Sequence, residues 1–463
     1  MTKQQTATPY NPITQGVIWK QLLTYFFPIL FGTFFQQLYN TVDAVVVGQF
    51  VGKEALAAVG GGTSNLLSII VNLFVGMAVG TTVVVAQSIG SGDNEKLSRT
   101  VHASVAMSFV GGLLFTFVGL GLTRPALAVM GTPADIMEHA VTVLHMYCLG
   151  MIPSFLYNVG TGILRAMGDT KRPLYFLMVA CGVNVVLDLL FVVVFHMGVA
   201  GAGIATVLSQ WVSAILVYAS LCRNSGPAHL DWRKIRLDLR CLWPVLVVGL
   251  PAGIQSNMYS ISNVVLQGCV NSFGTDTVAA LTSFTKVDGF YWMVIGAYGV
   301  AITTFAGQNF GAGLYSRVRQ SVRSCLLLSS VTTILLSVSM LALARPLLSM
   351  FGSDPVVLEL AQNMCNRMMP YYITYVCVEV MSGAIRGCGQ ALIPMIITGC
   401  GICGLRVLWV FLIMPLSNHM NTLLLSYPIS WSITSICFVL YYFVGKWLPK
   451  QDTVQPEVQT TVH

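Results

Sequence analysis

Two carboxylates and several amides interrupt the first and fifth long apolar stretches of this chain. In the first stretch, Gln36, Asn40 and Asp43 recur at i, i+4 and i+7, a spacing that places them on one face of a helix. In the fifth, Asn184 and Asp188 are four residues apart and also share a face. An ionisable group at membrane depth commonly marks an ion or substrate path. The alternative is a carboxylate that is hydrogen-bonded and only packs.

Counting residues predicts that these groups lie at the same depth. Asp43 and Asp188 each precede the turn at the outer end of their stretch by about eight residues, which corresponds to about 12 Å. Thr206 enters the sixth stretch from that same side. We therefore expect Asp43, Asn184, Asp188 and Thr206 to form one polar cluster. Two carboxyl groups buried close together hold a proton more readily than exposed ones, and the same oxygens could bind Na⁺.

The composition is that of a polytopic membrane protein, because 55% of the 463 residues are hydrophobic and only 9% are charged. Continuous apolar runs of about twenty residues favour helices over a barrel. We predict an all-α fold with twelve transmembrane helices in two pseudo-symmetric six-helix lobes. The expected spans are 19–50, 55–88, 100–123, 138–164, 173–196, 201–222, 243–270, 277–308, 321–344, 358–386, 394–415 and 422–445.

The basic residues predict the orientation. With twelve spans, 18 Lys and Arg lie in the termini and in the loops on their side, against three in the opposite loops. Positive residues stay in the cytoplasm, so both termini are expected inside the cell membrane. The predicted units are an N-terminal tail (1–18), an N-lobe (19–222), a cytoplasmic linker (223–242), a C-lobe (243–445) and a C-terminal tail (446–463). The linker either lies on the inner leaflet or is simply solvated.

Three pairs of short motifs recur at a displacement of 221 positions. Ala86–Gly92 (AQSIGSG) returns as GQNFGAG, Gly162–Gly168 (GILRAMG) returns as GAIRGCG, and Arg124-Pro125 returns as Arg345-Pro346. The same displacement in all three pairs indicates two homologous halves. Six helices per half give both halves the same topology, and parallel repeats of this kind typically work by alternating access.

These features resemble the multidrug and toxic compound extrusion (MATE) family from about Ile13 to Lys446. The resemblance implies a secondary active antiporter that exports organic cations or amphipathic drugs in exchange for H⁺, or alternatively Na⁺, without another cofactor. It further implies that Asp43, Asp188, Asn184 and Thr206 form the coupling-ion site of the branch with an N-lobe carboxylate. For Asn184 and Thr206, interhelical hydrogen bonding is an equal alternative.

Other polar residues inside the spans are candidates for lining the substrate cavity. They are Gln36, Gln37, Tyr39, Asn40, Asn65, Asn72, Lys286, Asp288 and Glu379. For Asn65 and Asn72, which lie on the second helix, hydrogen bonding to a neighbouring helix is the favoured alternative. For the C-lobe residues, structural pairing, for example of Glu379 with Arg406, is as strong an expectation as cavity lining. Helix 7 carries no acid, which argues against a C-lobe sodium site.

The sequence contains no P-loop, no metal-ligand spacing of histidines and no catalytic constellation. We therefore expect a transporter and not an enzyme, with small organic compounds and the lipid bilayer as partners, no nucleic acid and a monomeric state. Two rivals remain: a flippase for lipid-linked precursors from the same superfamily, and a membrane sensor that binds a ligand without transport.

Overall fold

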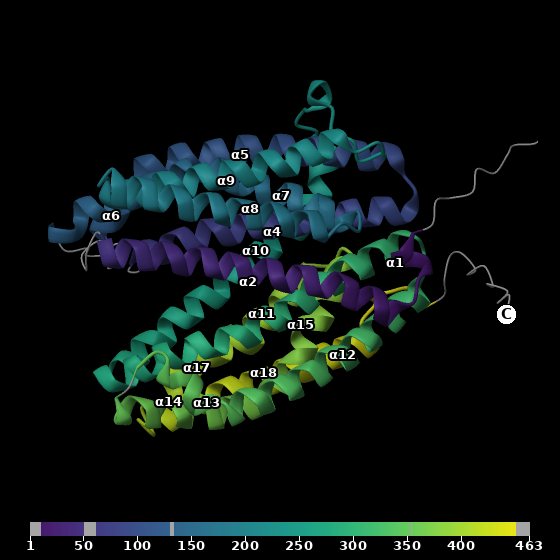
Figure 1. Cartoon of the computed structure of the whole chain (residues 1–463). Coiled ribbons are helices and arrows are strands. Elements are labelled where there is room, and N and C mark those ends of the chain that lie inside the picture. The colour runs from purple at the N-terminus through teal and green to yellow at the C-terminus, as the bar shows by residue number, and fades with distance from the viewer. Residues whose placement is uncertain (1–10, 51–61, 130–133, 353, 451–463) are drawn as a thin grey trace, which may run out of the picture.

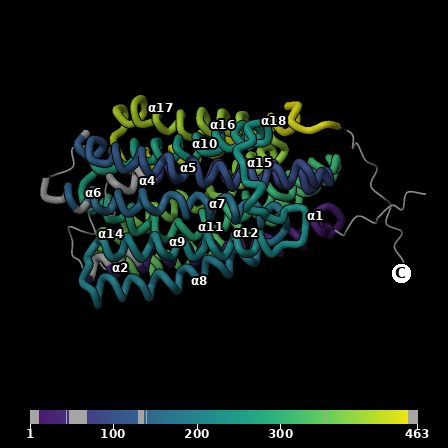
Figure 2. The backbone as a smooth tube through the Cα atoms, turned by 90° about the horizontal axis from the view of Figure 1, so that it is seen from above, coloured from purple at the N-terminus to yellow at the C-terminus, as the bar shows by residue number. Residues whose placement is uncertain are grey.

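A computed structural model describes residues 11–50, 62–129, 134–352 and 354–450. Within these ranges every regular element is a helix. The side chains of some residues inside these helices, among them Asp43 and Asn65, also lie outside the described part. Figure 2 shows that the long helices follow one common direction, with α1 (Pro12–Gln15) at one end and α6 and α14 at the other.

Twelve membrane crossings can be assigned. Nine helices of the described part are long and apolar enough to span a bilayer, and α6 with α7 forms a tenth, bent span. The helix α2 and the pair α14 and α15 complete the twelve, so the predicted helical fold is confirmed. The first six crossings are α2 (Ile18–Phe50), α4 (Gly62–Ser91), α5 (Asn94–Val129), α6 (Ala134–Leu149) with α7 (Met151–Ala166), α8 (Lys171–Asp188) with η1 (Leu189–Val194), and α9 (Gly198–Arg223). The second six are α10 (Leu239–Asn271), α11 (Thr275–Gly311), α12 (Tyr315–Ala342), α14 (Pro355–Met368) with α15 (Tyr372–Gly387), α16 (Leu392–Thr398) with α17 (Leu405–Leu412), and α18 (Met420–Val444).

Four of the crossings are not regular α-helices. The axes of α6 and α7 differ by 45° at Gly150. A 3₁₀ turn, η3 (Met369–Tyr371), separates α14 from α15 at Pro370, where the proline cannot donate a backbone hydrogen bond. Two π-helical segments, η1 and η4 (Gly399–Gly404), continue α8 and join α16 to α17. Irregular turns of this kind inside helices often accompany functional sites.

The helices form two lobes, which lie close together at the end that carries α1 and diverge toward the end that carries α6 and α14 (Figure 1). Between the lobes, α4 packs along α10 through glycines. Gly76 and Gly80 of α4 face Gly249 and Gly253 of α10, and a Cβ atom on Gly253 would lie 3.0 Å from the Cα atom of Leu73. Small residues at i and i+4 let two membrane helices approach backbone to backbone.

The duplicated motifs join the lobes reciprocally at the α1 end, which we call the closed end. Gln87 of α4 donates a hydrogen bond from Nε2 to the carbonyl oxygen of Gly387, at 2.9 Å. Its counterpart Gln308 of α11 donates from Nε2 to the carbonyl oxygen of Ala166, at 2.6 Å. Each pair is displaced by 221 positions from the other. The two motifs that the sequence repeats therefore meet each other across the lobe boundary.

The glycines of the same motifs complete this reciprocal contact. A Cβ atom on Gly90 would overlap the carbonyl oxygen of Gln308, and one on Gly311 would overlap that of Gln87. Gly168 and Gly389 have φ angles of 99° and 92°, a left-handed conformation that favours glycine at the turns that follow α7 and α15. The repeat thus encodes the joint between the halves.

Candidate functional site

A cavity of about 250 Å³ lies inside the N-lobe, among α2, α4, α6, α7, α8 and α9. The α2 helix contributes three of the predicted cavity residues, Gln36, Tyr39 and Asn40. Their spacing places them on one helical face, and the helix continues without a break through Pro28. The cavity is thus on the face of α2 that the polar spacing indicates.

Further polar residues line this cavity that sequence reasoning missed. They include Asn158 of α7 and Gln210 of α9, together with Ser154, Ser209 and Ser213. Aromatic side chains, Phe74, Tyr147 and Tyr157, also contribute to its wall. The signal for Asn158 and Gln210 was present, because both are amides inside apolar spans. All the described residues that line the cavity are uncharged.

The fifth crossing places two of the predicted coupling residues beside this cavity. Cys181 of α8 lines the cavity, and Asn184 and Asp188 follow it by one and two helical turns. Both side chains are fully buried, with 0% of their surface exposed. The amide oxygen and nitrogen of Asn184 find no hydrogen-bond partner among the described residues. Buried polar groups are almost always hydrogen-bonded, so this amide is suited to a ligand. The expected interhelical hydrogen bond of Asn184 is not found in the described part.

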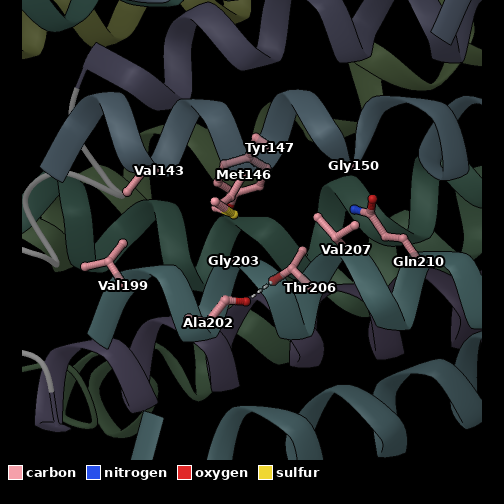
Figure 3. Close-up of a pocket in the computed structure, with 10 residues that line it drawn as sticks. All are labelled: Val143, Met146, Tyr147, Gly150, Val199, Ala202, Gly203, Thr206, Val207 and Gln210. Atoms are coloured by element: carbon pink, nitrogen blue, oxygen red, sulfur yellow. Dashed lines mark hydrogen bonds between the residues drawn. The ribbon is translucent and has the colours of Figure 1, made fainter. Parts of the chain in front are cut away.

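The other two predicted coupling residues are Asp43 and Thr206. Asp43 is on α2, three residues after the cavity-lining Asn40, but its side chain lies outside the described residues. Thr206 of α9 is buried and lines a small adjoining pocket of about 30 Å³, together with Gln210 (Figure 3). Its hydroxyl donates a hydrogen bond to the carbonyl oxygen of Ala202 in its own helix, at 2.9 Å.

The remaining cavity candidates lie elsewhere. Asn72 joins the lobes, because its Nδ2 donates to Oδ1 of Asn257 at 3.0 Å and to the hydroxyl of Ser260 at 3.1 Å. This is the interhelical bonding that the sequence favoured. Gln37 and Lys286 have exposed side chains and do not line the N-lobe cavity, and the side chain of Asn65 lies outside the described part.

Asp288 and Glu379 are held by aromatic residues in the C-lobe. The carboxylate of Asp288 accepts hydrogen bonds from Nε1 of Trp292, at 2.6 Å, and from the hydroxyl of Tyr372. Glu379 accepts a hydrogen bond from the hydroxyl of Tyr375, at 3.4 Å. Both carboxylates are thus hydrogen-bonded to aromatic side chains of the C-lobe.

The expected pairing of Glu379 with Arg406 is wrong. The ion pairs among the described residues do not include it. Arg406 is instead buried over the ring of Tyr427, 4.1 Å from its centroid, and its Nε donates to the hydroxyl of Ser430 at 3.1 Å. The planar guanidinium stacks on an aromatic face and does not need a carboxylate there.

A helical membrane protein with two repeated lobes and a polar cavity within one of them has the architecture of a secondary transporter. The chain belongs to the MATE family: the family model MatE matches residues 28–190 and 251–412, one segment in each half. Members of this family are transporters and not enzymes, as the sequence predicted.

Curated relatives agree with this assignment. The chain is 25% identical over 447 residues to the probable multidrug resistance protein YoeA of Bacillus subtilis, with 94% of this chain and 96% of that one covered. It is 25% identical to the probable multidrug resistance protein NorM of Thermotoga maritima, with 92% and 93% covered. A relative from Shewanella oneidensis, 27% identical over 74% of this chain and 76% of its own, is named as an FAD transporter.

Solved structures confirm the fold. A transporter of the MOP superfamily from Pyrococcus furiosus superposes with a TM-score of 0.87 at 22% identity, covering 94% of this chain and 97% of the other. A structure described as the outward-facing conformation of a multidrug resistance MATE family transporter gives the same TM-score, identity and coverage. The predicted twelve helices in two lobes are thus confirmed.

Proposed function

We propose that this protein exports organic cations or amphipathic drugs across the cell membrane in exchange for H⁺, with Na⁺ as the alternative coupling ion. The observation that carries this proposal is the fully buried pair Asn184 and Asp188 beside a polar cavity in the N-lobe. A carboxyl group in that position changes its charge only when an ion reaches it. An ion bound there can therefore be coupled to what the cavity holds.

The lining of the cavity favours a cationic or amphipathic substrate. Tyrosine and phenylalanine rings present faces that attract cations, and the amides of Asn158 and Gln210 supply neutral hydrogen-bonding groups. The FAD transporter among the relatives raises an anionic substrate as a second possibility. An anion of that charge requires basic residues around it, and the described lining contains none. The same observation argues against a flippase for anionic lipid-linked precursors.

The coupling step that we propose runs through α2. A proton from the outer side binds the carboxyl pair of Asp43 and Asp188 and reduces its negative charge by one, and α2 then repacks against α8. A bound cation loses its counter-charge in the cavity and leaves. Pro28 lacks one backbone donor and Gly32 has no atom within 4 Å of its Cβ position, so α2 can bend near these residues without a clash.

Alternating access also requires that the closed end opens. We propose that the reciprocal hydrogen bonds of Gln87 and Gln308 hold the lobes together on the cytoplasmic side while the outer side is open. This proposal is supported by the distribution of basic residues, from which we expect both termini and the closed end in the cytoplasm. Opening inward then breaks both bonds together.

Transport in proteoliposomes tests the proposal. The full-length protein should move a fluorescent organic cation when a proton gradient is imposed, and a parallel assay with a sodium gradient distinguishes the coupling ion. Asp188→Asn should reduce gradient-driven transport to background, because the side chain can no longer change its charge. Asp276→Asn, which alters an exposed aspartate of α11, is the matched control and should transport normally.

Three results would overturn the assignment. Full gradient-driven transport by a well-folded Asp188→Asn protein would show that the coupling ion binds elsewhere. Movement of labelled lipid instead of the cation would favour the flippase, and binding of the cation without movement would favour a sensor.

A further inference from the structure

An open groove of about 960 Å³ lies on the outer surface of the N-lobe, apart from the transport cavity. Its floor is formed by α5 and α9, and its upper wall is the segment that connects the two halves of the chain. The floor is apolar: Phe109 and Ile215 line it, and 50% and 59% of their side-chain surface is exposed. In a membrane protein such a groove is filled by lipid or by part of another molecule.

The connecting segment forms a fixed wall of this groove. Its residue Leu230 is buried in the N-lobe core. The backbone N–H of Asp231 donates a hydrogen bond to Nε2 of the buried His102 on α5, at 3.0 Å. The ring of Trp232 lies 6.3 Å from that of Tyr218 on α9. These contacts hold Trp232 at the rim, and the part of the connection around them is folded onto the lobe.

Two arginines give the groove a positive mouth. Arg223 at the end of α9 and Arg236 of the connecting segment both line it, and the described lining contains no acidic residue. Neither arginine belongs to an ion pair among the described residues. The neighbouring Asp238 accepts the backbone N–H groups of Arg240 and Cys241 at the start of α10. The side chain of Cys241 and the charge of Arg236 help to lower the pKa of Asp238, but its carboxylate forms no ion pair with Arg236. The two guanidinium groups are thus available for an anion.

The length of the groove matches one half of a bilayer. Trp211, the lining residue of α9 that is farthest from Arg223 in the sequence, precedes it by twelve residues, or about 18 Å along the helix axis. The hydrocarbon core of a bilayer is about 30 Å thick, so one leaflet contributes about 15 Å. A chain that starts at the arginines therefore reaches the middle of the membrane at the end of the groove.

From the apolar floor, the positive mouth and the matching length, we propose that this groove is a binding site for one anionic phospholipid. Its phosphate group binds Arg223 and Arg236, and an acyl chain lies between α5 and α9. Basic pockets beside membrane helices bind anionic head groups in this way. The site is separate from the N-lobe cavity, and it makes the connecting segment part of a lipid-binding site.

Lipid retention measured by native mass spectrometry tests the site. The full-length protein in detergent is titrated with phosphatidylglycerol or with zwitterionic phosphatidylcholine. The wild type should retain one phosphatidylglycerol more tightly than phosphatidylcholine. The double variant Arg223→Gln/Arg236→Gln should bind phosphatidylglycerol about thirtyfold more weakly. The control Arg124→Gln/Arg345→Gln removes two exposed arginines at the other end of the molecule and should bind like the wild type.

A second variant separates loss of the site from loss of the fold. Ala219→Leu adds side-chain volume to the groove wall and keeps both arginines. It should release the lipid while its thermal unfolding without added lipid stays that of the wild type. The proposal is overturned if the double variant retains phosphatidylglycerol as the wild type does, if the lipid persists in Ala219→Leu, or if phosphatidylcholine binds equally well.

Discussion

The reciprocal glutamine contacts make a quantitative prediction about the conformational equilibrium. Gln87→Ala and Gln308→Ala each remove one hydrogen bond between the lobes, to the carbonyl oxygens of Gly387 and Ala166 respectively. Gln308→Ala also removes the hydrogen bond that its Oε1 accepts from Nδ2 of Asn11, at 2.9 Å. A neutral hydrogen bond contributes about 1 kcal/mol net. If both bonds exist only while this end is closed, the double variant shifts the equilibrium toward opening by about 2 kcal/mol, or about thirtyfold. Each single variant shifts it about fivefold.

Distance distributions between the lobes measure this shift. Because the chain has 12 native cysteines, spin labels are best attached to non-canonical residues at exposed positions near the closed end. The double variant should show a larger population at long distance in pulsed electron resonance. Gln267→Ala is the control, because Gln267 is an exposed glutamine whose hydrogen-bond partner among the described residues is Asn271 of its own helix. An unchanged distribution in the double variant would refute the role of these contacts.

Three further predictions concern other parts of the fold. Gly90→Ala and Gly311→Ala should each open the closed end, because the added methyl group overlaps a carbonyl oxygen of the opposite lobe; the same distance measurement checks this. Arg406→Lys keeps the charge but loses the stacking and the Nε hydrogen bond, so the protein should be less stable by about 1–2 kcal/mol in thermal unfolding. The carboxylate of Asp231 in the connecting segment accepts a hydrogen bond from the backbone N–H of Arg233, which lowers the pKa of Asp231 from 3.8. The stability that this hydrogen bond gives to the folded segment is fully present above pH 3.8. It is lost as the pH falls through the lower pKa that Asp231 has in the folded state. The protection factors of the segment's amides in hydrogen exchange, which are corrected for the intrinsic rate at each pH, should therefore fall in acid, and less steeply in Asp231→Asn.

The fold could be predicted from sequence because it depends on signals that are local or periodic. Apolar runs of membrane length gave the crossings, and the displacement of 221 positions gave the two lobes. The apolar runs do not predict where a helix is interrupted. The expected span 358–386 is broken at Pro370, and the span 394–415 contains a π-helical segment. Composition alone does not determine such local changes in hydrogen bonding.

The candidate site was predictable only in part. Spacing placed Gln36 and Asn40 on one face of α2, because a helix fixes which residues share a side, and both line the N-lobe cavity. The contribution of Gln210 depends on which neighbour α9 packs against, and that is a long-range property. The pairing of Glu379 with Arg406 failed for the same reason: a charge count cannot show that an aromatic ring already occupies the face of the guanidinium.

The symmetry of the closed end has a consequence for how such a protein can arise. Each half contributes one glutamine, which donates a hydrogen bond to the other half, and one glycine, which packs against a backbone carbonyl of the other half. This is the geometry of an isologous interface, in which one surface is complementary to itself. A six-helix ancestor could therefore have assembled as a homodimer with this joint already complete. Gene duplication then needed only to add the connecting segment, and the two copies could diverge in their interiors while the joint between them was kept.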